Sequence, residues 1–225
     1  MTCLIYFSLV PMYNVPMFSF LKNRSGIWFH VFDVIFNVTI IVIIVAGIRT
    51  FLISPFQVEG SSMSATLEDN EYIIINKLAY FIGQPRRGDT VVFRPPSDRK
   101  KYYVKRVIGL PGEDIVIRDG LVFIRGYHNE EFSLDESYLD PKNHGKTFRH
   151  PPGSGDTSEV VYRIPEDHYF LLGDNRQGSL DSRSFTKEDS SSSPFVPEDD
   201  IKGRVWFVAL PITKIHALET PQYAL

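Results

Sequence analysis

Cysteine is almost absent from this chain of 225 residues, in which Cys3 is the only one. A single cysteine excludes an internal disulfide and a cysteine-based metal site. A cysteine nucleophile so close to the N-terminus is also disfavoured, because an apolar segment follows it. The soluble part has no cysteine, and this is compatible with either side of a membrane.

An excess of either sign of charge is lacking as well. The net charge is −3 and no block of like charge stands out, which disfavours a nucleic-acid partner. Metal-binding patterns such as HExxH are missing, so we expect neither a metal nor another cofactor. A hydrophobic content of 43% allows a substantial core, and the length suits one soluble domain plus an anchor.

One long apolar run is present near the start, over residues 28–48. As a helix it would be roughly 31 Å long, close to the ~30 Å hydrocarbon core of a bilayer. Its apolar side chains contribute on the order of −6 kcal/mol to insertion, which exceeds the about +3 kcal/mol that Asp33 would cost at the bilayer centre. We therefore predict a transmembrane anchor over residues 28–49.

The main alternative is a cleaved signal peptide, but no small-x-small cleavage site follows the run. Lys22 and Arg24 precede the anchor, whereas only Arg49 follows it before Lys77. This bias predicts a single-pass protein of the cell membrane, with a leader, residues 1–27, in the cytoplasm. Residues from about 50 onward would lie on the outer (periplasmic or extracellular) side of the membrane. The sequence leaves open whether translation starts at Met1, Met12 or Met17.

Three polar residues of the anchor, His30, Asp33 and Asn37, share one helical face. They would either contact another membrane helix or simply reach the nearby interface. We favour the interface.

After the anchor the pattern changes to short runs rich in β-branched and aromatic residues. We predict a mainly β fold, with an antiparallel β-sheet catalytic domain over 50–125 and 159–218, a small β-rich inserted cap over 126–158 and a tail over 219–225. Asp119-Gly120 between two apolar runs is a strong hairpin signal. Residues 187–200 are expected to form a loop, and a helix is expected only near 77–82. The predicted strands are Tyr72–Ile75, Thr90–Phe93, Tyr102–Ile108, Asp114–Ile117, Leu121–Ile124, His168–Leu172 and Val205–Ala209.

A reactive serine needs a base to take its proton. None of the six histidines has a recognisable partner motif. Ser97 and Lys100 match SxxK, a pattern of β-lactamases and penicillin-binding proteins. They lie in a charged stretch after Pro95-Pro96, however, and the companion motifs SDN and KTG are missing. We interpret that stretch as a loop.

Lysine is the alternative base. Strand alternation places Lys105 on the same face as Tyr103 and Val107, where a charged amine is costly. At its ordinary pKa of ~10.4 only about one lysine in 2500 is neutral at pH 7, and burial can raise that fraction. Taken alone, Lys105 is more simply explained as a solvated or ion-paired residue.

Three blocks together resemble the type I signal peptidases, membrane-bound serine proteases with a Ser/Lys dyad. They are residues 60–67 (GSSMSATL), 103–113 (YVKRVIGLPGE) and 173–183 (GDNRQGSLDSR). The anchor and residues 87–93 (RGDTVVF) also fit, and the likeness covers about residues 30–217. Each block alone would be weak evidence, but three in this order after an anchor are highly specific.

The resemblance implies a role for each matching residue. Ser62 would be the nucleophile and Lys105 the general base, with the Ser62 N–H donating to the oxyanion. Ser179 would orient the lysine amine by a hydrogen bond. Asp181 and Arg183 would form a supporting ion pair, and Asp174 would help to hold their loop.

Two positions depart from the family pattern. Gly60 stands where many members have a serine whose hydroxyl is the second oxyanion donor. Ala65 replaces the proline usual before Thr66, so we expect a less rigid turn after the nucleophile.

The resemblance also implies the substrate, namely the signal peptides of secretory pre-proteins, cleaved after small-x-small. In an extended chain alternate side chains point the same way, so two shallow pockets would bind the residue at the cut and the one two before it. The lipid bilayer and the protein-export machinery are the other expected partners. A catalytically silent scaffold and a self-cleaving Ser/Lys repressor relative are the alternatives, although the repressor would carry a DNA-binding module in place of the anchor. Our candidates for the substrate-binding lining are Phe56, Val58, Met63, Leu67, Tyr103 and Val104.

Overall fold

The computed structural model describes residues 26–126, 128, 130–149, 158–185, 193–221 and 223. The chain forms two compact units, residues 1–46 and 47–225. The three candidate start methionines lie outside the described residues, as do parts of the predicted cap and of the predicted 187–200 loop.

The first unit contains helix α1, Ile27–Gly47. A segment over Ile27–Thr50 has a mean hydropathy of 2.6, and by length and composition it can cross a membrane. Two of the three polar residues singled out in α1 pair with each other: Asn37 Nδ2 donates to the Asp33 carbonyl oxygen at 2.8 Å and to Asp33 Oδ1 at 3.3 Å. A second helix is therefore not needed to satisfy Asp33 and Asn37.

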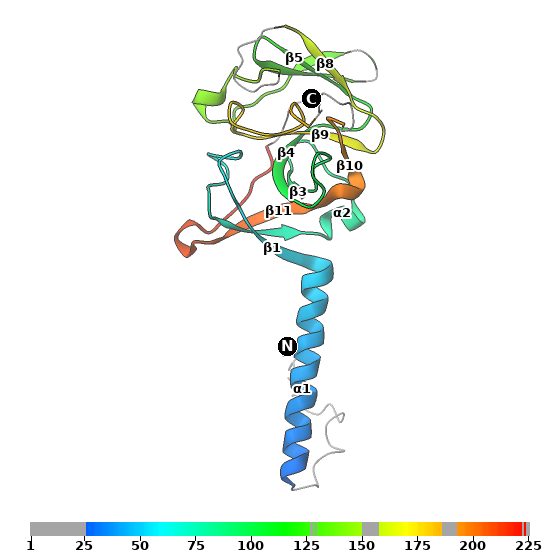
Figure 1. Ribbon diagram of the computed structural model, residues 1–225, viewed down its shortest axis with the longest axis vertical. Helices are drawn as coiled ribbons and strands as arrows, with labels where there is room; N and C mark the ends of the chain where they lie inside the picture. Colours follow the sequence, from blue (N-terminus) through cyan, green and yellow to red (C-terminus); the bar gives the residue numbers. More distant parts are fainter. Residues whose placement is uncertain are drawn as a thin grey trace, which may run out of the picture. The chain divides into compact units, whose positions relative to one another are not determined.

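The second unit is built mainly from antiparallel strands (Figure 1). Its main sheet has the strand order β1-β2-β11-β3-β4-β9-β10, with β12 paired to β11. Bulges in β11 and β4 interrupt the register and curl the sheet into a half-barrel. The strands are β1 (Ile53–Gln57), β2 (Tyr72–Asn76), β3 (Thr90–Phe93), β4 (Tyr103–Gly109), β9 (His168–Leu172), β10 (Val196–Pro197), β11 (Ile201–Leu210) and β12 (His216–Ala217).

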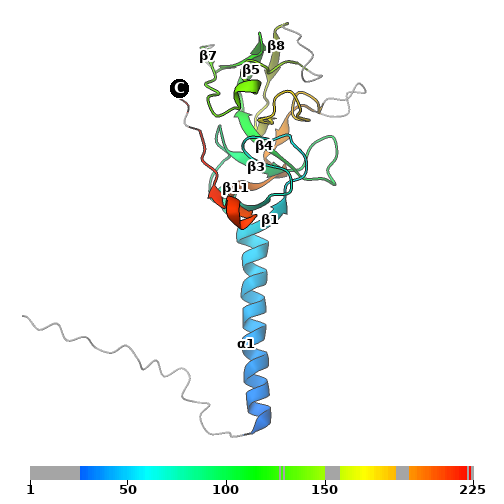
Figure 2. The same ribbon diagram turned by 90° about the vertical axis from the view of Figure 1, so that its left-hand side faces the viewer.

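A second, four-stranded sheet has the order β7-β6-β5-β8. Its β5–β6 hairpin, which was predicted, turns at Asp119 and Gly120, and their positive φ angles of 53° and 78° are those of a type I′ turn. This sheet begins earlier than the predicted cap, because β5 and β6 belong to it rather than to the main sheet. It lies at the opposite end of this unit from β1 (Figures 1 and 2). Its strands are β5 (Asp114–Arg118), β6 (Leu121–Arg125), β7 (Glu131–Ser133) and β8 (Val160–Arg163).

Short helical turns occupy several connections: η2 (Ile48–Leu52), α2 (Ala79–Ile82), η3 (Pro141–Asn143), η4 (Glu198–Asp200) and η5 (Ile212–Lys214). Every predicted strand is present within a residue or two, except that β11 is longer than predicted. The sequence analysis did not predict β1, which contains Pro55. As the edge strand of the sheet, β1 tolerates a residue that has no N–H to donate.

Two apolar clusters matter for the site. The first joins the two sheets through residues such as Ile115, Ile124 and Phe170. The second lies under the segment that contains Ser62, and we call it the lower cluster. It contains Val58, Met63, Leu67, Ile73, Ile75, Val92, Val205 and Val208, with Phe56, Val104 and Leu218 packed against it.

Candidate active site

Ser62 lies at the start of a single helical turn that follows β1. The N–H groups of Thr66 and Leu67 donate to the Met63 carbonyl oxygen at 3.0 and 2.8 Å. Met63 and Leu67 therefore share one face of the turn, and their side chains are buried in the lower cluster. We expected both in the substrate-binding lining, and this was wrong: they anchor the turn that presents Ser62.

Strand β4 brings Lys105 to Ser62. The amine of Lys105 lies 2.6 Å from Ser62 Oγ and donates to the Val104 carbonyl oxygen at 2.9 Å. The ring of Tyr103 lies 5.5 Å from the same nitrogen. Lys105 is only 3% exposed. The residues that the sequence analysis paired as nucleophile and base are thus within hydrogen-bonding distance.

Burial changes the acidity of this lysine. Desolvation lowers the pKa of Lys105 from 10.5 to about 8, although the negative charges of Asp181 and Asp174 act in the opposite direction. With a pKa near 8, about one amine in ten is neutral at pH 7, rather than one in thousands. A neutral amine at this distance from a hydroxyl can accept its proton.

Ser179 does not make the hydrogen bond expected of it. Its hydroxyl is buried and makes no hydrogen bond of good geometry within the described residues, although it lies near Asp181 and helps to lower the pKa of that carboxyl. It packs against Gly173 so closely that a Cβ on that glycine would lie 2.1 Å from Ser179 Oγ. The carbonyl of Val104, not Ser179, holds the lysine amine in this structure.

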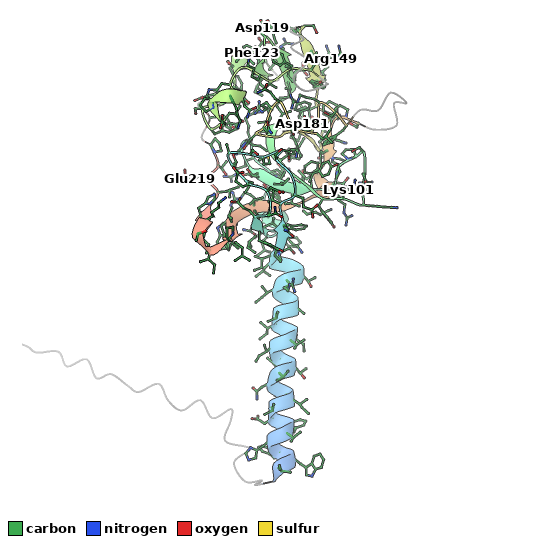
Figure 3. All side chains as sticks on the ribbon, turned by 60° about the vertical axis from the view of Figure 1, so that its left-hand side comes forward. Lys101, Asp119, Phe123, Arg149, Asp181 and Glu219 are labelled. Carbon is green, nitrogen blue, oxygen red and sulfur yellow. The ribbon has the colours of Figure 1, made fainter. Side chains whose placement is uncertain are left out.

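Asp181 and Arg183 form the predicted ion pair. Arg183 donates from Nε to Asp181 Oδ1 at 2.9 Å and from Nη2 to Oδ2 at 2.8 Å, and both side chains are fully buried. Burial raises the pKa of Asp181, but the charge and hydrogen bonds of Arg183 and the N–H of Gly173 bring it below its ordinary value. Asp181 is therefore a fixed negative charge in the interior of the second unit (Figure 3).

Asp174 connects all three sequence blocks. Arg106, the neighbour of Lys105, donates to Asp174 Oδ1 at 2.9 Å and to Oδ2 at 2.6 Å. Thr66, in the turn after Ser62, donates to Asp174 Oδ2 at 2.5 Å. The expected role of Asp174 was only to hold its own loop, whereas here it also joins the lysine strand to the nucleophile turn.

Arg106 and Asn175 contact the blocks that carry the dyad, and neither was among the predicted site residues. Asn175 donates from its side chain to the Ser61 carbonyl oxygen at 3.0 Å, and its N–H donates to that of Ser62 at 3.1 Å. Arg106 had a detectable signal. Arg106 follows Lys105 in an apolar strand, so its side chain lies on the opposite face. If that face is also buried, the guanidinium needs an acidic partner, and such a pair could have been predicted.

A cleft of about 550 Å³ opens beside the dyad, and both Ser62 and Lys105 line it. Four of the six lining residues that we expected are present in it: Phe56, Val58, Tyr103 and Val104. Its floor is the upper surface of the lower cluster. The lining also includes residues that were not predicted, among them Gln57, Ile73, Val92, Lys101, Tyr102 and Leu180.

The two departures from the family pattern have visible consequences. Gly60 has φ +87° and its N–H donates to Asp69 Oδ1 at 2.7 Å, so that amide is not free to bind an oxyanion. Among the described residues the Ser62 N–H has no hydrogen-bond acceptor, and it remains available. Ala65 has φ 80°, which proline cannot adopt. The turn after Ser62 therefore follows a path that excludes the proline usual at this position.

Among the described residues no histidine lines the cleft, and the rings of His144, His168 and His216 bond to nearby backbone carbonyl groups. In the part of the chain that the structure describes, no group of three or more His, Cys, Asp or Glu side chains could hold a metal ion.

Comparison with known proteins gives a consistent set of matches. A family model described as "Signal peptidase, peptidase S26" matches residues 31–210. Signal peptidase I P of Bacillus subtilis subsp. natto is 35% identical over 182 residues, which cover 79% of this chain and 88% of that protein. Signal peptidase I of Bacillus caldolyticus is 39% identical over 168 residues, covering 74% and 84%. Among solved structures, a signal peptidase I from Enterococcus faecalis matches with a TM-score of 0.40 and 31% identity, over 55% of this chain and 97% of that one.

Proposed function

Because this chain belongs to the signal peptidases of the peptidase S26 family, which are serine endopeptidases, we propose that Ser62 is its nucleophile and Lys105 its general base. The observation that supports this most directly is the 2.6 Å separation of Lys105 Nζ and Ser62 Oγ at the wall of the cleft. The lowered pKa of Lys105 supports the same assignment.

The reaction follows from this geometry. Neutral Lys105 accepts the hydroxyl proton as Ser62 Oγ attacks the scissile carbonyl, and the resulting ammonium donates a proton to the leaving amine. A water molecule, deprotonated by the same amine, then hydrolyses the acyl-enzyme. The free N–H of Ser62 stabilises the oxyanion in both steps.

The substrate is the region of an exported pre-protein around its signal-peptide cleavage site, bound in extended form. Among the described strands β1 pairs only with β2, and β9 pairs with β4 from Arg106 onward. Main-chain groups of Phe56–Ser61 and of the segment before Lys105 are thus placed to pair with an added strand. The apolar floor between them favours small side chains at the cut and two residues before it.

The membrane setting is part of the proposal. We propose that the apolar α1 spans the bilayer once, and the positive charges of Lys22 and Arg24 before it support a cytoplasmic N-terminus. The catalytic domain then works on the outer side, beside the lipid bilayer and the export machinery from which pre-proteins emerge.

The test uses the detergent-solubilised full-length chain and a precursor peptide with alanine at both small positions. Ser62→Ala and Lys105→Arg should abolish cleavage while the proteins stay folded, because guanidinium cannot act as a base at useful pH. Ser97→Ala and Lys100→Arg, the same substitutions in the β3–β4 loop, should leave cleavage unchanged. Full activity of either dyad variant contradicts the assignment, and an inactive wild-type chain would indicate a silent scaffold.

A further inference from the structure

The C-terminal end of the described chain is not a loose tail. We call its described residues, Leu218–Pro221 and Tyr223, the C-terminal strap. The Leu218 N–H donates to the Trp206 carbonyl oxygen at 3.0 Å, and its side chain packs against the lower cluster. Thr220 Oγ1 donates to the buried Asp89 Oδ1 at 3.2 Å. Figure 2 shows this red segment rising along the outside of the second unit, and Figure 3 labels Glu219 in it.

The strap fits closely over Gly88, just before β3. A Cβ on Gly88 would lie 3.0 Å from Tyr223 Cε2, 3.1 Å from Thr220 Cγ2 and 3.2 Å from the Pro221 carbonyl oxygen. Gly88 has φ +91°, so its backbone also favours glycine. The carbonyl of this same residue accepts a hydrogen bond from Arg106 Nη1 at 2.8 Å. The strap therefore covers one of the groups that hold Arg106.

A second contact runs from the strap to Arg106 through an aromatic pair. The ring of Tyr223 meets the ring of Tyr138 edge-on, with centroids 6.3 Å apart and an interplanar angle of 85°. The ring of Tyr138 in turn lies over the Arg106 guanidinium, 4.4 Å from its central carbon. Arg106 is thus held by Asp174, by Gly88 and by Tyr138.

The chemistry of the two phenols is simple. Burial raises the pKa of both Tyr138 and Tyr223, so both are neutral at working pH. The Tyr223 hydroxyl makes no hydrogen bond of good geometry within the described residues, although Tyr138 beside it opposes the rise of its pKa. We therefore expect the ring of Tyr223, rather than its hydroxyl, to make the main contribution.

We propose that the C-terminal strap positions the Ser62/Lys105 dyad from behind, with Thr220 and Tyr223 as positioning residues. Tyr223 and Tyr138 fix the Arg106 guanidinium, Arg106 fixes Asp174, and Asp174 holds Thr66 in the turn that presents Ser62. No described residue of the strap lines the cleft, so the strap acts indirectly, through these residues and through the packing of Leu218 against the lower cluster. This inference rests on the proposed function of the dyad.

The test compares Tyr223→Ala with Tyr223→Phe in the full-length chain, using the precursor peptide. Loss of the ring should lower kcat about tenfold or more and leave KM within about twofold, because small displacements of reacting groups are costly. The midpoint of the pH–kcat/KM profile should rise toward that of an ordinary lysine as water reaches Lys105. Tyr223→Phe should keep the wild-type kcat and midpoint.

A purely structural strap would give a different result. Tyr223→Ala would then lower the melting temperature but keep wild-type kcat and pH profile at a temperature where it is folded, and this overturns the proposal. An equal loss in Tyr223→Phe also overturns it. If Tyr223→Ala does not fold, Thr220→Val takes its place. This variant keeps the methyl group on Gly88 but loses the hydrogen bond to Asp89, and it should lower kcat severalfold. An unchanged kcat and pH profile of Thr220→Val overturns the proposal. Failure of the dyad itself is recognised separately, as an inactive wild-type chain or an active Ser62→Ala.

Discussion

Asp174 accepts two hydrogen bonds from Arg106, at 2.9 and 2.6 Å, directly behind Lys105. The side chains are only 2% and 3% exposed. Two charges removed from water are favourable only when each satisfies the other, so neither can be lost alone without leaving a buried, uncompensated charge. Thr66 uses a further lone pair of the same carboxylate. The geometry of the dyad therefore depends on a pair that takes no part in proton transfer.

Arg106→Met should accordingly destabilise the protein by about 3–5 kcal/mol and lower kcat, because Asp174 is left buried and unpaired. The measurement is chemical denaturation in detergent, followed by cleavage kinetics on the folded fraction. Arg106→Met/Asp174→Asn should cost less than the sum of the single changes.

Arg118 provides the matched control. It bonds Glu131 and Glu159 at 2.8 and 3.0 Å, but its side chain is 35% exposed. Arg118→Met should cost far less stability than Arg106→Met, because exposed ion pairs are screened by water. Equal losses at Arg106 and Arg118 would show that burial does not set the energy of the Arg106–Asp174 pair.

The pH dependence of cleavage follows from the lowered pKa of Lys105. The amine is active when neutral, so kcat/KM should rise with pH through a midpoint of about 8, the pKa in the folded protein. A midpoint near 10 would mean that Lys105 is solvated in the active enzyme, or that it is not the base. The profile is measured with the wild-type chain at constant ionic strength, over the range in which the protein stays folded.

Lys105 should also be a source of instability at neutral pH. Its pKa is lower in the folded chain than the ordinary 10.5, so the folded state binds fewer protons between pH 8 and 10.5. The cost of burying the ammonium, at most about 3 kcal/mol, is fully present below pH 8 and decreases as pH rises toward 10.5. Lys105→Met should therefore be more stable than wild type at pH 7, by a margin that shrinks toward pH 10. A margin that is constant or grows with pH would contradict this.

The sequence predicted what depends on local pattern. Period-two runs located the strands, Asp119-Gly120 located a hairpin, and three short blocks located Ser62, Lys105 and the Asp181–Arg183 pair. It failed where partners come from distant segments. Met63 and Leu67 were assigned to the cleft because their helical spacing over one turn was overlooked. Pro55 concealed β1, and nothing in the composition of residues 219–225 indicates that the ring of Tyr223 meets the ring of Tyr138 edge-on.

Ala65 has a left-handed backbone, and this gives substitutions of opposite effect. Glycine adopts φ 80° without strain, so Ala65→Gly should stabilise the protein by roughly 0.5–1 kcal/mol. Ala65→Pro, which restores the residue usual in the family, should destabilise it by more than 1 kcal/mol because proline cannot adopt this angle.

The control for Ala65 is Ala217, in the exposed strand β12, which does not have a positive φ. Ala217→Gly should destabilise slightly, since glycine only adds freedom to the unfolded chain there. Denaturation midpoints of the three variants test the sign of each change. A stable, fully active Ala65→Pro would mean that the turn after Ser62 does not follow the described path.

Ile73 and Ile75 allow the selectivity of the cleft to be tested with one substitution at two places. Both lie on β2, both are buried in the lower cluster, and only Ile73 lines the cleft. Ile→Val at either site should cost about 0.5–1.5 kcal/mol of stability. Only Ile73→Val deepens the floor of the cleft, so only this variant should accept valine better at the small positions of the substrate. The preference for alanine over valine, as a ratio of kcat/KM, should fall by about tenfold for the one methylene removed. The ratio of kcat/KM for the two peptides measures this. If Ile75→Val relaxed the ratio equally, selectivity would come from the rigidity of the whole cluster and not from the contact between Ile73 and the substrate.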